Sequence, residues 1–493
     1  MPRQSDIGWT WHGQDDNAER QKPGSARGGA PCRAALIEIS TGDALVKRRL
    51  RMELAGAQSP AELGKEVRKR LAAIGRARSF VDWRGIKSLA ADLEAQRTAI
   101  AGAIAQRDPA EALDLLWRFM ELANPVFSRC DDSNGYISPI FCQACEDLGA
   151  IAVLAKPSAQ ALAEQSFRAL LANDYGQFDG LIAALAKALG KAGLDHLKQF
   201  MVDLSNRPVE KPVAKDRIMI GYGSAGPIYQ DEIAERSRVN TVKLALQEIA
   251  DAQGDVDAFI AQYDAKTRKV PAIAAEIAQR LLAAERLEEA WSAIEAAVPR
   301  PRAREDWLDF EWEDARIAVL EALGRATEAQ EARWHCFERA LSPSHLREYL
   351  KRLPDFDDVE AEEKALDLVK KDKDFSGALG FLVSWPDLNR AAALVMERRR
   401  ELDGDRYEIL TPASEALAGK HKLAAVLVLR AMIDFALTHN RSSRYKHAAR
   451  HLLSCASLSA QGEAFGSLEP HDAYVARLRR EHARKSSFWS LVA

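Results

Sequence analysis

Apolar residues recur at helical spacing along most of the chain. The stretch that follows Asp108 carries two adjacent stripes of them: Leu113, Leu116, Trp117 and Met120 in one, and Leu115, Phe119 and Leu122 in the other. Residues three and four positions apart share one face of a helix, so each stripe predicts a helix. A helix that is apolar over so wide an arc is packed by neighbours on more than one side. The pattern therefore predicts helices stacked against helices.

Two helix starts are marked by their capping residues. The sequences SPAE (residues 59–62) and DPAE (residues 108–111) each place a capping side chain first, Pro second and Glu last. The cap oxygen is expected to accept from an otherwise unpaired amide, and the Glu side chain to bond back to the amide of the cap. We therefore expect helices to begin at residues 60 and 109.

A weak repeat runs through the second half of the chain. The pair Glu289-Ala290 recurs 39 residues later as Glu328-Ala329. Bulky-then-small pairs follow less regularly: Phe375 with Ala378, and Leu423 with Ala425 and Ala431. Small residues let two helices approach closely, as in tetratricopeptide pairs with their period of about 34 residues. Because strand signals are confined to residues 215–230, the sequence predicts an all-α fold, an α-solenoid of irregular tetratricopeptide-like helix pairs.

Composition divides the chain into four parts. Residues 1–35 are rich in Gly, Arg, Gln and Asp without apolar periodicity, which indicates a disordered extension. Residues 36–204 form an N-terminal helical-repeat region, and residues 231–493 form a C-terminal tetratricopeptide-like region. Between them, residues 205–230 hold several helix breakers: Pro208, Pro212, Gly221, Gly223, Gly226 and Pro227. We interpret that segment as a linker or long loop.

Charge and cysteine content limit the cellular compartment and the class of partner that we expect. The formal net charge of the 493 residues is −3, so no overall field attracts nucleic acid or membrane. Six cysteines in so long a chain do not form a disulfide framework and suit a reducing compartment. No apolar stretch of signal-peptide length opens the chain, and the most apolar run, residues 423–437, is interrupted by Arg430 and Asp434. We expect a cytoplasmic protein without a membrane partner.

A glycine motif invites a nucleotide-binding interpretation. Residues 221–226 (GYGSAG) match G-x-G-x-x-G, and the strand-like residues 218–220 precede them. However, Pro227 delays the helix that would hold the pyrophosphate, and no second strand follows. The favoured interpretation is a flexible loop with one short hairpin. The alternative is a nucleotide-binding protein or enzyme with its site at this loop, between the halves.

Two motifs are similar to metal sites but lack ligands. Cys142 and Cys145 form a C-x-x-C without a second pair. We expect both to lie on one buried helix and to face the protein core. Residues 132–135 (DSNG) are similar to the start of a calcium loop. The twelfth position of that loop requires a Glu, and Phe141 occupies it, so no calcium site is expected.

His447 and His451 have the i, i+4 spacing of zinc metalloproteases. Ala448 replaces the general-base Glu, which excludes proteolysis by that mechanism. Cys455 lies one turn further on, so the three side chains remain a candidate metal site, although packing is the favoured interpretation. No nucleophile elbow, phosphate-binding loop or kinase motif is present. We expect no catalytic residue, no cofactor and no metal.

The residues around 441–451 form the one candidate partner-binding face. No acid lies among Arg441, Arg444, Tyr445, Lys446, His447, Arg450 and His451. The alternatives are a solvated helix surface, or a surface that the acids of residues 355–363 neutralise. The basic residues of 43–87, twelve Lys and Arg against five acids, form a second face to test. The first interpretation is a scaffold that binds a protein partner; nucleic-acid binding through phosphate contacts and the same basic tracts is less favoured.

Four segments carry a resemblance to a known family: residues 175–181 (YGQFDGL), 249–257 (IADAQGDVD), 445–453 (YKHAARHLL) and 484–491 (RKSSFWSL). They resemble an uncharacterised bacterial domain-of-unknown-function family, and the similarity covers residues 36–491. The resemblance implies a long helical protein and no particular activity. Some helical-repeat relatives carry a SWIM zinc finger, whose C-x-C and C-x-H pairs are absent here. Residues 1–34 depart from the family pattern, for which an alternative start or a reading-frame accident is our hypothesis.

Overall fold

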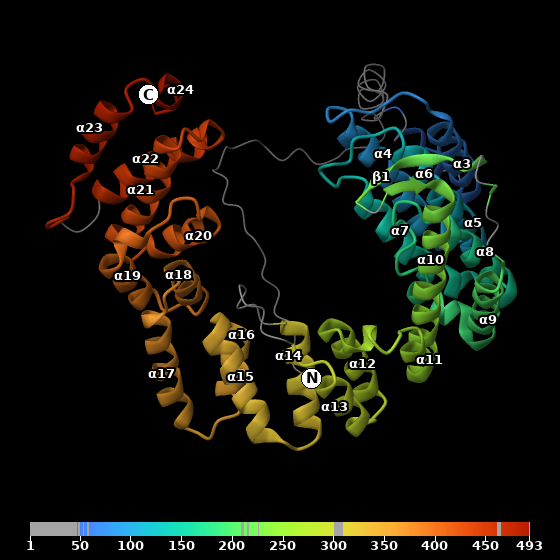
Figure 1. Cartoon of the computed structure of the whole chain (residues 1–493). Coiled ribbons are helices and arrows are strands. Elements are labelled where there is room, and N and C mark those ends of the chain that lie inside the picture. The colour runs from blue at the N-terminus through green and yellow to red at the C-terminus, as the bar shows by residue number, and fades with distance from the viewer. Residues whose placement is uncertain are drawn as a thin grey trace, which may run out of the picture. The chain divides into compact units, whose positions relative to one another are not determined.

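The computed structural model describes residues 47, 50–52, 54–56, 59–208, 212–213, 216–224, 226–299, 309–460 and 465–492. The predicted disordered extension, residues 1–35, lies outside them. Most of the described residues are helical, so the prediction of an all-α fold is confirmed (Figure 1). The chain forms two compact units, Met1–Ala258 and Phe259–Ala493. The tetratricopeptide-like character of the helix pairs stays a prediction.

The first unit has one apolar core. Its elements are α3 (Pro60–Arg76), α4 (Ile86–Ala99), the π-helical turn η1 (Ile100–Ile104), α5 (Pro109–Met120), α6 (Ala123–Phe127), α7 (Ser138–Ala155), α8 (Ala159–Leu171), α9 (Leu181–Ser205), the strands β1 (Met219–Gly223) and β2 (Gly226–Tyr229), and α10 (Gln230–Gln253). Helix α5 packs on α7, and α9 packs on α7, α8 and α10. Both predicted stripes of α5 are buried in this core, which confirms their assignment.

Both predicted helix starts are confirmed, but with a different hydrogen-bond arrangement. Ser59 accepts from the amide of Glu62 at 3.2 Å, and Asp108 accepts from the amide of Glu111 at 3.0 Å. The expected bond from each Glu back to its cap is not formed. The amides of Ser59 and Asp108 donate instead to carbonyls of the preceding turn, and the Glu side chains pair with Lys65 and Arg68.

The glycine motif lies in a β-hairpin. Strands β1 and β2 pair antiparallel, with Gly223 opposite Gly226. The favoured sequence interpretation, a short hairpin, is therefore correct, and the strand–loop–helix arrangement of a dinucleotide site is not formed. Helix α10 begins directly after β2 and packs along α9 in the first unit. The boundary between the two compact units falls within α11 (Val256–Ala261). The predicted linker at residues 205–230 stays a prediction.

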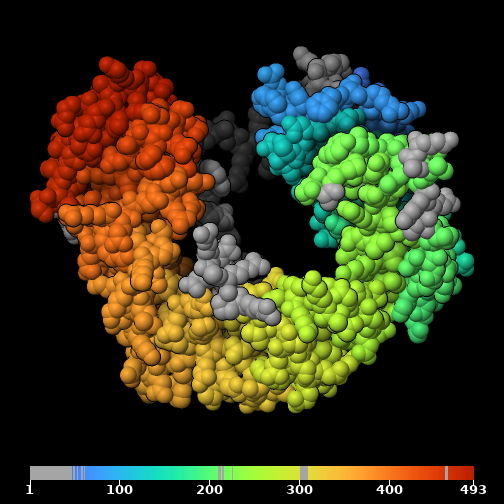
Figure 2. All heavy atoms as spheres, in the orientation of Figure 1, coloured from blue at the N-terminus to red at the C-terminus, as the bar shows by residue number. Residues whose placement is uncertain are grey.

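The second unit is a succession of helices. They are the 3₁₀ turn η3 (Thr267–Lys269), α12 (Pro271–Ala283), α13 (Leu287–Glu295), α14 (Phe310–Ala322), α15 (Ala326–Ala340), α16 (Pro343–Leu350), α17 (Asp357–Lys371), α18 (Phe375–Ser384), α19 (Leu388–Glu397), η4 (Arg399–Glu401), α20 (Tyr407–Leu417), α21 (Lys422–Thr438), η5 (Ser442–Arg444), α22 (Tyr445–Ala460), α23 (His471–Glu481) and α24 (Ser486–Trp489). Within this unit the helices pack mainly on the next one or two helices in sequence. The order of colours from yellow to red in Figure 2 follows this succession.

The 39-residue repeat corresponds to a repeated helix start. Arg286 precedes α13 and pairs with Glu289, and Arg325 precedes α15 and pairs with Glu328, both at the i, i+3 spacing. The alanine after each of these acids is completely buried. Short side chains at these positions let the second helix of each pair approach its neighbours, which is the reason the sequence repeats there.

Helix α7 accounts for two sequence motifs. Asp132 accepts from the amides of Ile137 and Ser138 at the start of α7, which explains the calcium-like residues as a helix cap. Of the C-x-x-C pair, Cys145 is buried but Cys142 is exposed, so the expectation that both face the core is wrong for Cys142. Helix α7 is also the one described helix long and apolar enough to cross a bilayer, and its buried face packs on α5 and α9 in the core.

Candidate binding site on the C-terminal unit

The basic tract lies at the turn between α21 and α22. Arg441, Lys446, His447 and Arg450 are exposed there, whereas Arg444 and His451 are half-buried. Tyr445 is buried and packs edge-on against Phe488, with ring centres 5.9 Å apart. Tyr445 therefore belongs to the core, and the cationic side chains alone form the surface.

Four of these residues line one cavity, which we call the basic groove. It has a volume of about 500 Å³ between α20, α21 and α22, and its lining includes Arg444, His447, Arg450 and His451. Its apolar floor is contributed by Leu429, Met432 and Ala436 of α21 and by Leu458 of α22. Glu415 is the acid in the lining. The groove thus combines an apolar floor with a largely cationic rim.

Arg444 has a partner within the protein. Its Nη1 donates to Oδ1 of Asp405 at 2.7 Å, and its guanidinium lies over the rings of Tyr407 and Phe435, at 4.7 Å and 5.6 Å. These contacts attach the loop before α20 to the start of α22. Gly404 of that loop touches α21 so closely that a Cβ would lie 2.0 Å from the carbonyl oxygen of Ala431.

The other cations of the tract differ from Arg444. Among the described residues, Arg441, Lys446 and Arg450 form no ion pair. In the acidic segment of residues 355–363, Glu363 pairs with Arg390, and Glu362 accepts from the indole of Trp385. Among the described residues, no ion pair joins that acidic segment to the basic tract, and two of its acids bind side chains of neighbouring elements instead. Asp405 supplies the one acid that pairs with the described tract.

His451 remains neutral more readily than an exposed histidine. Burial lowers the pKa of His451, and electrostatic repulsion from His447 and Arg450 lowers it further. A bound anion would act in the opposite sense, because it favours the imidazolium form.

Part of the basic stretch of residues 43–87 is paired inside the first unit. Lys65 pairs with Glu62, Arg68 with Glu111, and the Arg70 guanidinium with the buried carboxylate of Asp92. The described part of this stretch is therefore a less complete cationic surface than the sequence indicated.

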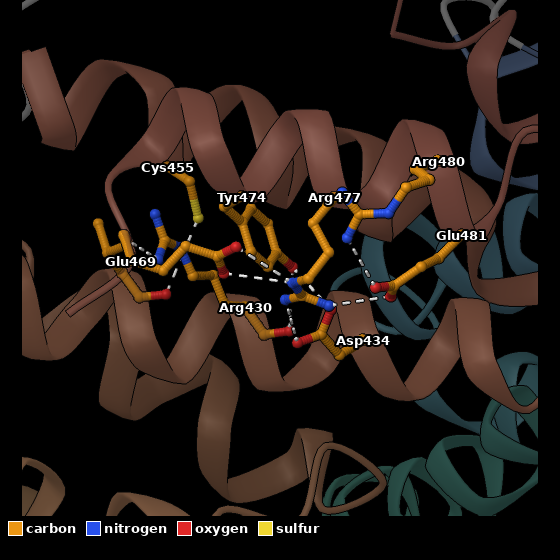
Figure 3. A network of polar contacts seen from close by, with 9 residues as sticks. Arg430, Asp434, Cys455, Glu469, Tyr474, Arg477, Arg480 and Glu481 are labelled. Atoms are coloured by element: carbon orange, nitrogen blue, oxygen red, sulfur yellow. Dashed lines mark hydrogen bonds and ion pairs between the residues drawn. The ribbon is translucent and has the colours of Figure 1, made fainter.

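A second cavity, which we call the Arg430 cavity, lies between residues 399–404, helix α21 and residues 468–477. Its volume is about 520 Å³, and its lining includes Arg430, Asp434, Glu469, Tyr474 and Arg477. Side chains of α21 and α23 point toward one another there (Figure 3). Tyr474 is fully buried and donates to Oδ1 of Asp434 at 3.1 Å.

Arg477 forms ion pairs with most of the acids around the Arg430 cavity. It pairs with Asp434 at 3.4 Å and with Glu469 and Glu481 at 3.3 Å (Figure 3). Burial raises the pKa of Asp434, and the charge of Arg477 opposes that change. The carboxylates nearest to Arg430 are therefore bound by Arg477 rather than by Arg430.

The suspected metal ligands do not converge. Cys455 is buried and its thiol approaches the carbonyl oxygen of Val426 at 3.9 Å, whereas His447 is exposed on the rim of the groove. Across the part of the chain that the structure describes, no group of three or more His, Cys, Asp or Glu side chains could hold a metal ion.

The Arg430 cavity is not predicted by the sequence patterns. Arg430 and Asp434 interrupt the most apolar run of the chain, and at the level of sequence they serve only as an argument against a membrane span. A charged residue on a helix that is buried on most sides is a signal for a functional or paired group. That signal identifies Arg430 but gives no indication of the residues of α23 around it.

The similarity to a known family extends well beyond the four segments that resemble it. Residues 26–491 match the family described as "Family of unknown function (DUF6880)". The match begins earlier than expected, so residues 26–35, which the composition sets apart from the family pattern, fall within it. No curated protein matches the sequence. Because the family match covers most of the 493 residues, the chain belongs to this family of unknown function, DUF6880.

Proposed function

We propose that this chain is a non-catalytic, cytoplasmic binding protein, and that the basic groove of its C-terminal unit holds an acidic segment of a protein partner. The observation that carries the proposal is the rim of the groove. Arg450 and His447 line a cavity of about 500 Å³ and are exposed, and Arg450 has no ion pair among the described residues. Cations without an internal partner are complementary to an acidic ligand.

The floor of the groove indicates a peptide rather than a bare anion. Leu429 and Met432 are 5% exposed each, and both line the cavity. Methionine adapts its shape to different apolar side chains, which is why it is common on peptide-binding surfaces. The combination fits a segment whose apolar side chains enter the floor while its Asp or Glu side chains face the rim.

A scaffold made of stacked helix pairs is the architecture that we propose for this role. Successive helix pairs expose extended surfaces, which repeat proteins commonly use to bind partners. Nucleic acid is the less favoured partner, because an apolar floor contributes little to phosphate recognition. Binding of nucleic acid would also depend steeply on salt, since it releases counterions.

The test uses an array of short peptides that carry at least two acidic and two apolar side chains, with a Lys-for-Glu counterpart of each. The full-length protein should bind a subset of the acidic peptides and none of the basic ones. Lys446→Glu with Arg450→Glu should weaken the binding of that subset about tenfold or more, since one tenfold step corresponds to about 1.4 kcal/mol.

The matched control is Lys371→Glu with Lys373→Glu, which changes the net charge equally at exposed positions of the same unit. It should leave peptide affinity unchanged. If both double variants weakened peptide binding equally, the change in net charge alone would explain the effect, and the proposal would be overturned. Preferential binding of a single-stranded RNA, with affinity falling steeply as salt rises, would replace it with the nucleic-acid alternative.

A further inference from the structure

Arg430 is a buried cation whose hydrogen bonds are incomplete. Its side chain is 5% exposed, and its Nη1 donates to the carbonyl oxygen of Glu469 at 2.7 Å. Its Nε and Nη2 have no hydrogen-bond partner among the described residues. Buried polar groups in folded proteins are nearly always hydrogen-bonded, so two unpaired donors on one guanidinium require an explanation.

Aromatic rings cover the faces of the Arg430 guanidinium, but one of its edges forms no hydrogen bond among the described residues. The ring of Tyr474 lies 4.4 Å from the guanidinium carbon and the ring of Phe465 lies 5.0 Å from it. The Nη1 side is held by the backbone of Glu469. What remains is the edge formed by Nε and Nη2, whose two parallel N–H groups match the two oxygens of a carboxylate.

The acids of the neighbourhood do not complete that edge. Asp434, one turn further along α21, accepts from Tyr474 and pairs with Arg477. The side chain of Glu469 also pairs with Arg477. The charge of Arg430 is therefore buried beside two acids without an ion pair to either of them, and burial lowers its pKa.

We propose that Arg430 anchors a binding site for a small polar carboxylate in the Arg430 cavity. The carboxylate accepts from Nε and Nη2 of Arg430, and the body of the ligand occupies the cavity of about 520 Å³. The cavity is lined by charges of both signs, including Arg399 and Asp403, which favours a polar ligand over a fatty acid. This site is distinct from the basic groove and does not depend on the function proposed for it.

The ligand enters by a small local displacement. The Nε and Nη2 atoms are shielded from solvent, with Phe465 and Tyr474 over the guanidinium. Phe465 is only half-buried, so its ring can move with less loss of packing than the fully buried Tyr474. Tyr474, in contrast, is fixed by its bond to Asp434.

The experiment titrates the full-length protein, in carboxylate-free buffer, with acetate, succinate and citrate, and with acetamide and succinamide as neutral counterparts. Isothermal calorimetry should show saturable binding of at least one carboxylate and none of the amides. Arg430→Met, which keeps the apolar stem, should weaken that binding at least tenfold. Arg430→Lys should also weaken it, because a lysine retains the charge but not the two parallel donors.

The matched control is Arg480→Met on α23, an exposed arginine that pairs only with Glu481 among the described residues. It should bind the carboxylate as the parent protein does. If Arg430→Met does not fold, the ¹⁵N resonance of the Arg430 Nε–H group in the parent protein replaces it, and carboxylate but not amide should shift that resonance. No saturable carboxylate binding, equal binding by Arg430→Met, or preference for sulfate over every carboxylate would overturn the proposal.

Discussion

Nη1 of Arg444 lies 2.7 Å from Oδ1 of Asp405, although 39 residues separate them in sequence. The pair fastens the loop before α20 to the start of α22, at the edge of the basic groove. It also divides the basic tract into two kinds of residue. Arg444 contributes to the fold, whereas Lys446 and Arg450 are exposed and form no ion pair within the described chain.

Charge reversal should separate these two kinds of residue. Arg444→Glu removes the ion pair and places a carboxylate beside Asp405, so it should lower the free energy of unfolding by about 1 kcal/mol. Lys446→Glu should change it by less than about 0.5 kcal/mol, because the side chain is exposed. Urea denaturation of the two single variants measures both values.

The exchange of both charges is the control for this pair. Arg444→Glu combined with Asp405→Lys should recover part of the loss, since opposite charges again face each other across the loop. An Arg444→Glu variant as stable as the parent protein, or a Lys446→Glu variant equally destabilised, would show that the Asp405 contact does not matter for stability.

Gly404 should be the least replaceable glycine of the C-terminal unit. A Cβ at this position would lie 2.0 Å from the carbonyl oxygen of Ala431 and 2.6 Å from Cβ of Phe435, so the loop would have to leave α21. Gly404→Ala should therefore cost about 2 kcal/mol or more. Gly419→Ala is the matched control, because a Cβ there would meet nothing within 4 Å. Equal thermal stability of the two variants would contradict the close approach.

The parts of the fold that depend on local sequence could be predicted. The caps at Ser59 and Asp108 bond to amides three residues later, so the sequence alone contains both partners. The buried stripes of α5 follow from helical spacing in the same way. The predicted bonds from the side chains of Glu62 and Glu111 back to their caps are not formed, because Lys65 and Arg68 bind these carboxylates. Arg68 lies on a different helix from Glu111, so its competition is not visible in the local sequence.

The candidate sites depend on contacts that the sequence does not contain. The basic tract is visible in the sequence because its cations are close together along the chain. Its pairing is not, since Asp405 lies in a different loop. Likewise, Arg430 interrupts an apolar helix in the sequence, but its missing partners are apparent only once α23 is placed beside α21. The sign of a local charge could be predicted, and its neutralisation could not.

Thiol reactivity should distinguish the cysteines of the described chain. Burial raises the pKa of Cys145, Cys336 and Cys455 to about 12, so these thiols are both shielded and protonated at neutral pH. Cys142 is exposed. Brief treatment of the native protein with iodoacetamide, followed by peptide mass spectrometry, should modify Cys142 well before those three. Alkylation of Cys455 at a comparable rate would contradict the packing of α22.

The pH dependence of stability should report the burial of His451. Its pKa in the folded protein lies below the ordinary value of about 6.5, chiefly because of burial, so the unfolded chain binds a proton more readily. Stability contributed by this group is therefore complete above pH 6.5 and declines as pH falls from there toward the folded pKa. Burial lowers the pKa of His471 and His482 as well, so they act in the same direction.

Comparison of variants isolates the contribution of His451. The melting temperature is measured between about pH 5 and pH 8, the range in which histidines titrate. His451→Gln should lose less stability than the parent protein on acidification, because no proton is taken up at this position on unfolding. Arg450→Gln should have a smaller effect in the same direction, since it removes one of the charges that lower the pKa of His451. An acid dependence identical in all three proteins would mean that His451 is solvated, and that the rim of the groove is more open than its packing against α20 and α21 indicates.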